Sequence, residues 1–91
     1  MNRIWIDVKP DEPSDSSEAK TKFSKVDELL KSYKHERESL SRGFRWKVSD
    51  EGLEDVKAHA RVISSNLSRF LRENEFLVSL GDNAAAESYS E

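Results

Sequence analysis

The fold prediction rests on residues 53–77, which read LEDVKAHARVISSNLSRFLRENEFL. Apolar residues recur there at alternating spacings of three and four, which is the pattern of one helix in a left-handed coiled coil. We predict a helix over about residues 50–80, ended by Gly81. Its expected dimer or partner interface consists of Leu53, Val56, Ala60, Ile63, Leu67, Phe70, Asn74 and Leu77.

A second stripe of the same period comes earlier in the chain. It predicts a helix over about residues 18–41, with Ser16 or Ser17 able to cap its start and Gly43 able to end it in a left-handed turn. The a and d positions of its heptad frame hold Phe23, Val26, Leu30, Tyr33, Arg37 and Leu40.

Two short segments have the alternation of a strand instead. Residues 3–9 place Ile4, Ile6 and Val8 on one side of an extended chain, and residues 44–48 do the same with Phe44, Trp46 and Val48. Since an isolated pair of strands is marginal, the second segment is either an amphipathic connector or a strand that pairs with the first.

These elements predict a mainly α protein with four segments along the chain. Residues 1–9 are a short strand, 10–17 a flexible linker with Pro10 and Pro13, 18–80 a helical hairpin domain, and 81–91 a disordered acidic tail. Two long helices leave apolar faces uncovered, so we expect them to close as a dimeric four-helix bundle.

The composition also points to a partner. The chain has 91 residues, of which 35% are hydrophobic and 36% charged, so its core is poorer than that of an ordinary domain. It has no cysteine, which excludes disulfides and thiolate metal sites. No apolar run approaches the roughly 18 residues of a membrane span, and no hydrophobic signal segment follows the N-terminus. We therefore expect a cytoplasmic homodimer with no membrane contact.

Catalytic motifs are weak in this sequence. His35 and His59 each have a carboxylate within a helical turn, but two ligands do not make a metal site and no third is in register. The three glycines are isolated, so there is no phosphate-binding loop. We expect no enzymatic activity, no metal and no cofactor.

Three binding functions remain as expectations. The first is a protein-interaction module (an adaptor, inhibitor or chaperone-like regulator) that acts through its amphipathic helical faces. The alternative is a nucleic-acid-binding regulator that uses the basic and aromatic connector, whose net positive charge suits phosphate and whose rings suit bases. The connector residues are Arg42, Phe44, Arg45, Trp46 and Lys47. A third is an inhibitor whose acidic tail or linker wraps its target and folds on it.

Overall fold

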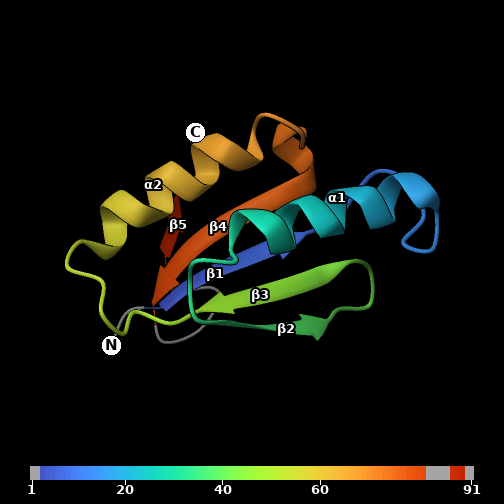
Figure 1. Cartoon of the computed structure of the whole chain (residues 1–91). Helices are drawn as coiled ribbons and strands as arrows, with labels where there is room; N and C mark the ends of the chain where they lie inside the picture. Colours follow the sequence, from blue (N-terminus) through green and yellow to red (C-terminus); the bar gives the residue numbers. More distant parts are fainter. Residues whose placement is uncertain (1–2, 82–86, 90–91) are drawn as a thin grey trace.

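A computed structural model of the chain describes residues 3–81 and the backbone of 87–89 (Figure 1). Two helices separate three groups of strands along it, and a short 3-10 helix precedes the fourth strand. The elements are β1 (Arg3–Val8), α1 (Ser17–Leu29), β2 (His35–Ser39), β3 (Phe44–Val48), α2 (Val56–Leu67), η1 (Glu73–Glu75), β4 (Phe76–Gly81) and β5 (Glu87–Tyr89).

The strands form one antiparallel sheet in the order β2-β3-β1-β4-β5. α1 leads from β1 to β2, which is two positions away, and α2 leads from β3 to β4 across β1. This is the split β-α-β arrangement. Figure 1 shows both helices over the same face of the sheet, so no helix of the described residues covers its other face.

Alternation along the central strands fills the layer between sheet and helices. Ile4, Ile6 and Val8 are fully buried, and in the register of the sheet Ile6 stands beside Trp46 of β3 and Val78 of β4. Both partners are themselves fully buried. Because side chains alternate across a strand, the residues between Ile4, Ile6 and Val8 point to the other face of the sheet, away from the helices.

Trp46 is the largest fully buried side chain in the described part of the chain. Its indole Nε1 donates to Asp27 Oδ1 of α1 at 2.9 Å, and Asp27 also accepts from Arg37 of β2 at 3.0 Å. The Phe23 ring packs edge-on against Phe44 with centroids 4.7 Å apart. One aromatic cluster thus joins α1, β2 and β3.

The predicted helix over 18–41 is wrong beyond its first half. α1 begins where expected, since the Ser16 hydroxyl accepts from the amide of Ala19, but it ends at Leu29 and residues 35–39 form β2. Between Tyr33 and Leu40 there is no apolar residue to extend the helical stripe, and the backbone pairs with β3 instead. Gly43 does adopt a positive φ of 86°, in the β2–β3 turn, where a Cβ would lie 2.0 Å from the Val8 carbonyl oxygen.

The predicted helix over 50–80 is wrong at both ends. α2 starts after its cap Asp55, whose side chain accepts from Ala58, and it ends at Leu67. From Phe76 the apolar period changes from helical to alternating, because Phe76, Val78 and Leu80 face the helices from β4.

The mainly α hairpin, the coiled coil and the four-helix bundle are therefore wrong. The stripe of α2 is used within its own chain, since Ala60, Ile63 and Leu67 are at most 1% exposed in the core beneath the helices. Whether two chains associate stays a prediction.

The predicted linker at 10–17 is a loop tied to the body of the protein by Glu75. This carboxylate, 1% exposed, accepts from the amide of Asp11 at 2.8 Å and from Lys22 Nζ at 2.6 Å. It also accepts from the amide of Arg72 at 2.8 Å. Burial raises the pKa of Glu75, but the two amides and the ammonium group outweigh it, so the net pKa is lowered. Glu75 therefore links α1, the loop and the start of β4.

Two further expectations concern the ends and the membrane. Gly81 closes β4 and residues 87–89 form β5, whereas the rest of the predicted tail at 81–91 lies outside the described residues. Neither helix of the part that the structure describes has the length and apolarity needed to cross a bilayer.

Candidate functional site

The candidate site is the face of the sheet that the helices leave open. We define the open face by the outward residues of its four longer strands. The register places these residues opposite or diagonal to one another on neighbouring strands. They are Arg3, Trp5 and Asp7 of β1, Arg45 and Lys47 of β3, Glu36 and Glu38 of β2, and Leu77 and Ser79 of β4.

Trp5 lies at the centre of the open face but is only 7% exposed. Its Nε1 donates to the carbonyl oxygen of Gly81 at 3.0 Å. Lys47 Nζ and the Arg45 guanidinium stand 5.5 Å and 5.9 Å from its ring centroid, within the range of a cation–π contact. Trp5 is thus a fixed apolar floor beneath two cationic side chains.

The charges of the open face are largely paired across the strands. Arg45 forms a two-pronged ion pair with Asp7, at 2.6 Å from Nε and 3.0 Å from Nη2. Hydrogen bonding to Asp7 raises the pKa of Arg45 further. Glu38 lies 3.5 Å from Lys47 and 3.9 Å from Arg45. Arg3 and Glu36 have no side-chain partner within the residues that the structure covers.

Leu77 is the apolar exception on this charged face. It stands opposite Asp7 in the register, and its side chain is 41% exposed. Among the described residues the other exposed large hydrophobic side chain is Val62, which is 56% exposed on α2. Within the described residues Leu77 has a paired strand on its β1 side only, because β5 pairs with Val78, Ser79 and Leu80. Covering its exposed surface would remove apolar area from water, which favours a bound state.

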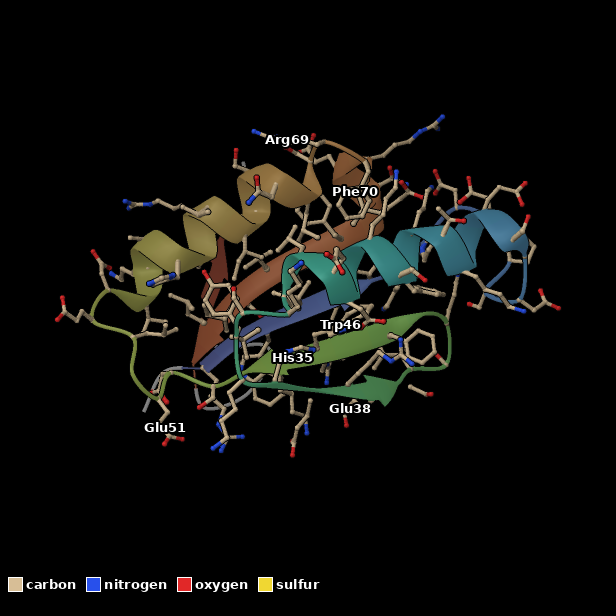
Figure 2. All side chains as sticks on the ribbon, in the orientation of Figure 1. His35, Glu38, Trp46, Glu51, Arg69 and Phe70 are labelled. Atoms are coloured by element: carbon tan, nitrogen blue, oxygen red, sulfur yellow. The ribbon has the colours of Figure 1, made fainter. Side chains whose placement is uncertain are left out.

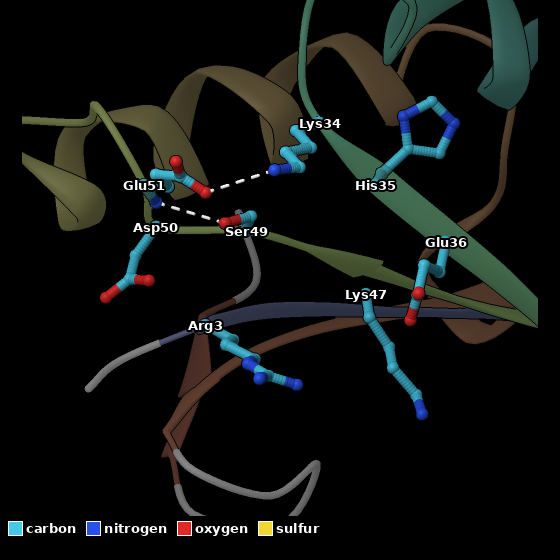
Figure 3. Close-up of a pocket in the computed structure, with 8 residues that line it drawn as sticks. All are labelled: Arg3, Lys34, His35, Glu36, Lys47, Ser49, Asp50 and Glu51. Atoms are coloured by element: carbon cyan, nitrogen blue, oxygen red, sulfur yellow. Dashed lines mark hydrogen bonds and ion pairs between the residues drawn. The ribbon is translucent and has the colours of Figure 1, made fainter.

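One end of the open face continues into a hollow of about 640 Å³ (Figure 3). Lys34 and Glu51 form an exposed ion pair of 3.2 Å there, and the Ser49 hydroxyl accepts from the amide of Glu51. The lining residues are Arg3, Lys34, His35, Glu36, Lys47, Ser49, Asp50 and Glu51. The hollow therefore carries both signs of charge. No group of three metal-binding side chains occurs in residues 3–81.

The structure divides the connector residues predicted to bind nucleic acid between two faces. Phe44 and Trp46 point into the helical layer, while Arg45 and Lys47 point to the open face (Figure 2 labels Trp46 beneath α1). Arg42 donates to the carbonyl oxygen of Pro10 at 2.8 Å. The five residues do not form one basic and aromatic surface.

The predicted interface over 53–77 is also divided. Leu53, Val56 and Phe70 are half-buried against the same core that contains Ala60, Ile63 and Leu67. Asn74 is exposed in η1 and donates to Asp11 Oδ1 at 2.9 Å. Leu77 alone of the eight lies on the open face.

The two histidines are placed in ordinary polar contacts. His59 Nδ1 lies 2.8 Å from the Tyr33 hydroxyl, and His35 Nδ1 donates to the Tyr33 carbonyl oxygen at 2.8 Å. His59 thus contacts Tyr33 between α2 and the segment after α1, whereas His35 lines the hollow together with Lys34 and Glu36.

Sequence reasoning missed β2 and the outward side of β4. The polar segment His35–Ser39 carries no hydrophobic alternation, so nothing in its pattern distinguishes an edge strand from a helix surface. Phe76, Val78 and Leu80 do alternate with Leu77 and Ser79, and this change of period could have revealed β4.

Comparison with protein-family models, curated proteins and solved structures finds no match to this chain. The function is therefore argued from the chemistry of its own surfaces.

Proposed function

We propose that this chain is a small, non-enzymatic protein-binding module, an adaptor or inhibitor, that binds its partner through the open face. The observation that carries the proposal is Leu77, a leucine 41% exposed beside Asp7 on a sheet face whose charges are largely paired. We assign binding to the sheet and not to the helical faces, because the apolar residues of both helices are packed in the core.

The charge balance of the open face favours a protein over a polyanion. Its cations are Arg3, Arg45 and Lys47, and its carboxylates Asp7, Glu36 and Glu38 are equal in number. A phosphate backbone placed here would meet as many carboxylates as cations. Protein interfaces combine an apolar centre with a polar rim, and arginine and aromatic residues are enriched in them.

The partner's chemistry follows from the same residues. It presents an apolar side chain that covers Leu77 and charges of both signs that meet Arg3 and Glu36, the two open-face charges without a partner in residues 3–81. A second copy of the chain meets this description, since the open face carries both signs itself. We expect the complex to form in the cytoplasm.

The test compares Leu77→Lys with the matched variant Val62→Lys. Each places the same charge on one of the two exposed hydrophobic sites, but only Leu77 lies on the open face. The full-length wild type and both variants are each immobilised on a resin and incubated with nuclease-treated extract of the cells that make the protein. The partner protein that wild type captures is then purified and titrated against all three. We expect wild type and Val62→Lys to bind it equally, and Leu77→Lys to bind at least about tenfold more weakly.

Light scattering on the free protein identifies self-association. If wild type has about twice the 10.5 kDa mass of one chain and Leu77→Lys has that mass alone, the partner is a second copy. Equal binding by Leu77→Lys and wild type would contradict the assignment of the open face. A lack of any stoichiometric partner, in extract or in solution, would contradict the class of function.

A further inference from the structure

A second surface lies on the opposite side of the molecule and has a different charge pattern. From Asp55 to Glu73 the sequence contains no carboxylate residue between these two. The interval holds four cations in a chain whose net charge is -3. We call them the cationic stripe: Lys57, Arg61, Arg69 and Arg72.

α2 carries two of these cations, Lys57 and Arg61, on its outer side, and the other two follow its last residue, Leu67. Its inner side is buried through Ala60, Ile63 and Leu67, whereas Lys57 and Arg61 are exposed one helical turn apart, about 6 Å along the axis. Arg69 follows about 12 Å further on, just past the carboxyl end of α2 and on the side away from the sheet (Figure 2). The stripe thus begins on α2 and continues into the segment that follows it.

Three of the four charges of the cationic stripe are unpaired in the described chain, and the fourth, Arg72, forms a long ion pair with Asp11. Lys57, Arg61 and Arg69 have no ion-pair or hydrogen-bond partner for their side chains anywhere in the described chain. Arg72 is 81% exposed, with Asp11 at 3.6 Å. By contrast, Lys31 and Lys34, which are equally accessible, each contact a carboxylate, Glu28 at 2.6 Å and Glu51 at 3.2 Å. The three unpaired cations contribute a local positive field, because salt screens acids that lie beyond about 8–10 Å.

We propose that the cationic stripe binds the sugar–phosphate backbone of duplex nucleic acid without reading its bases. Cations on a helix and on the segment after it can each contact a phosphate, and release of counterions drives such binding. The opposite side of α2 is packed against the core, so the helix lies along the backbone rather than deep within a groove. None of the four stripe residues is aromatic, so the stripe lacks the stacking platform typical of single-strand binding.

An anionic membrane is the less favoured partner for this stripe. Helices that lie on a bilayer insert a broad apolar face, whereas the outer side of α2 exposes one large hydrophobic residue, Val62. The duplex assignment is independent of the open face, which lies on the far side of the sheet. Either function can fail without the other.

The test measures binding of a fluorescein-labelled 20-base-pair DNA duplex by anisotropy at several KCl concentrations. For three to four phosphate contacts the slope of log K against log salt is about -3, which means a loss of about 60-fold in affinity between 50 and 200 mM. The double variant Arg61→Ala/Arg69→Ala removes two contacts. We expect its slope to be about -1.2 and its loss over the same range to be about fivefold.

The matched control is Lys31→Ala/Lys34→Ala, which removes the same charge from paired, exposed sites and is expected to keep the wild-type slope. The proposal is overturned if the control loses as much as the stripe variant, or if the duplex does not bind at 20 mM KCl. Tighter binding to the corresponding single strand, or binding only to vesicles containing phosphatidylserine, would overturn the duplex assignment.

Discussion

Replacement of Trp46 by alanine is expected to lower the free energy of unfolding by about 3–5 kcal/mol, enough to unfold a domain of this size or nearly so. The indole is fully buried between Phe23, Phe44 and Asp27, and its removal leaves a cavity where β3 meets α1. It also removes the donor that holds Asp27 at 2.9 Å.

Urea denaturation followed by circular dichroism measures this loss, and Leu77→Ala is its control. Leu77 is 41% exposed on the other face of the sheet, so its truncation is expected to cost less than about 1 kcal/mol. Equal effects of the two substitutions would contradict the assignment of the two faces, because that assignment buries one side chain and leaves the other open.

The second large effect is expected for Glu75→Gln, at about 2–3 kcal/mol near pH 7. The carboxylate offers two acceptor oxygens to the amides of Asp11 and Arg72 and to Lys22. Glutamine offers one acceptor and turns an NH2 group toward the remaining donors. Glu38→Gln is the control, since this side chain is 43% exposed and its loss is expected to cost about 0.5 kcal/mol or less.

The pH dependence distinguishes the charge of Glu75 from its shape. Its folded pKa lies below its usual value of 4.5, so its stabilising effect is complete above that value and is lost as pH falls through the lowered folded pKa. The difference in stability between wild type and Glu75→Gln should therefore be largest near neutral pH and shrink below about pH 4.5. A difference that stays constant down to pH 3 would show that the charge contributes nothing.

The sequence predicted those parts of the fold in which local pattern and tertiary packing agree. The alternation at Ile4, Ile6 and Val8 predicted a strand where β1 lies. The predicted pairing of residues 44–48 with that strand is the pairing of β3 with β1. The spacing of Phe23 and Val26 and the cap at Ser16 likewise marked α1.

The remainder depended on long-range pairing that periodicity does not report. Leu67 and Phe70 fit one continuous heptad frame with Leu77, yet the chain turns after Leu67 because Phe76, Val78 and Leu80 gain more by completing the sheet beside β1. β2 owes its strand conformation to hydrogen bonds with β3 and not to its own composition. The helical hairpin was predicted because the apolar patterns of α1 and α2 were extended beyond Leu29 and Leu67, where the two helices end.

The candidate sites were hidden by the same error. An assumed helix placed Leu77 beside Phe70, whereas β4 carries it to the far side of the sheet, next to Asp7. The cationic stripe did not show in the net charge of its segment. Residues 49–91 carry 4 basic and 9 acidic side chains, but all four cations fall in one interval that contains no acidic residue.

Both proposed surfaces depend on the strand order β2-β3-β1-β4, which places Leu77 on the open face of the sheet and the cationic stripe on α2 and the segment after it. Nuclear Overhauser contacts in the isotopically labelled full chain test this order most directly. We predict cross-strand backbone contacts between Arg37 and Trp46, and from Ile6 to both Trp46 and Val78. Helical contacts between residues three apart running unbroken through 30–41, without those cross-strand contacts, would contradict the fold and both surfaces built on it.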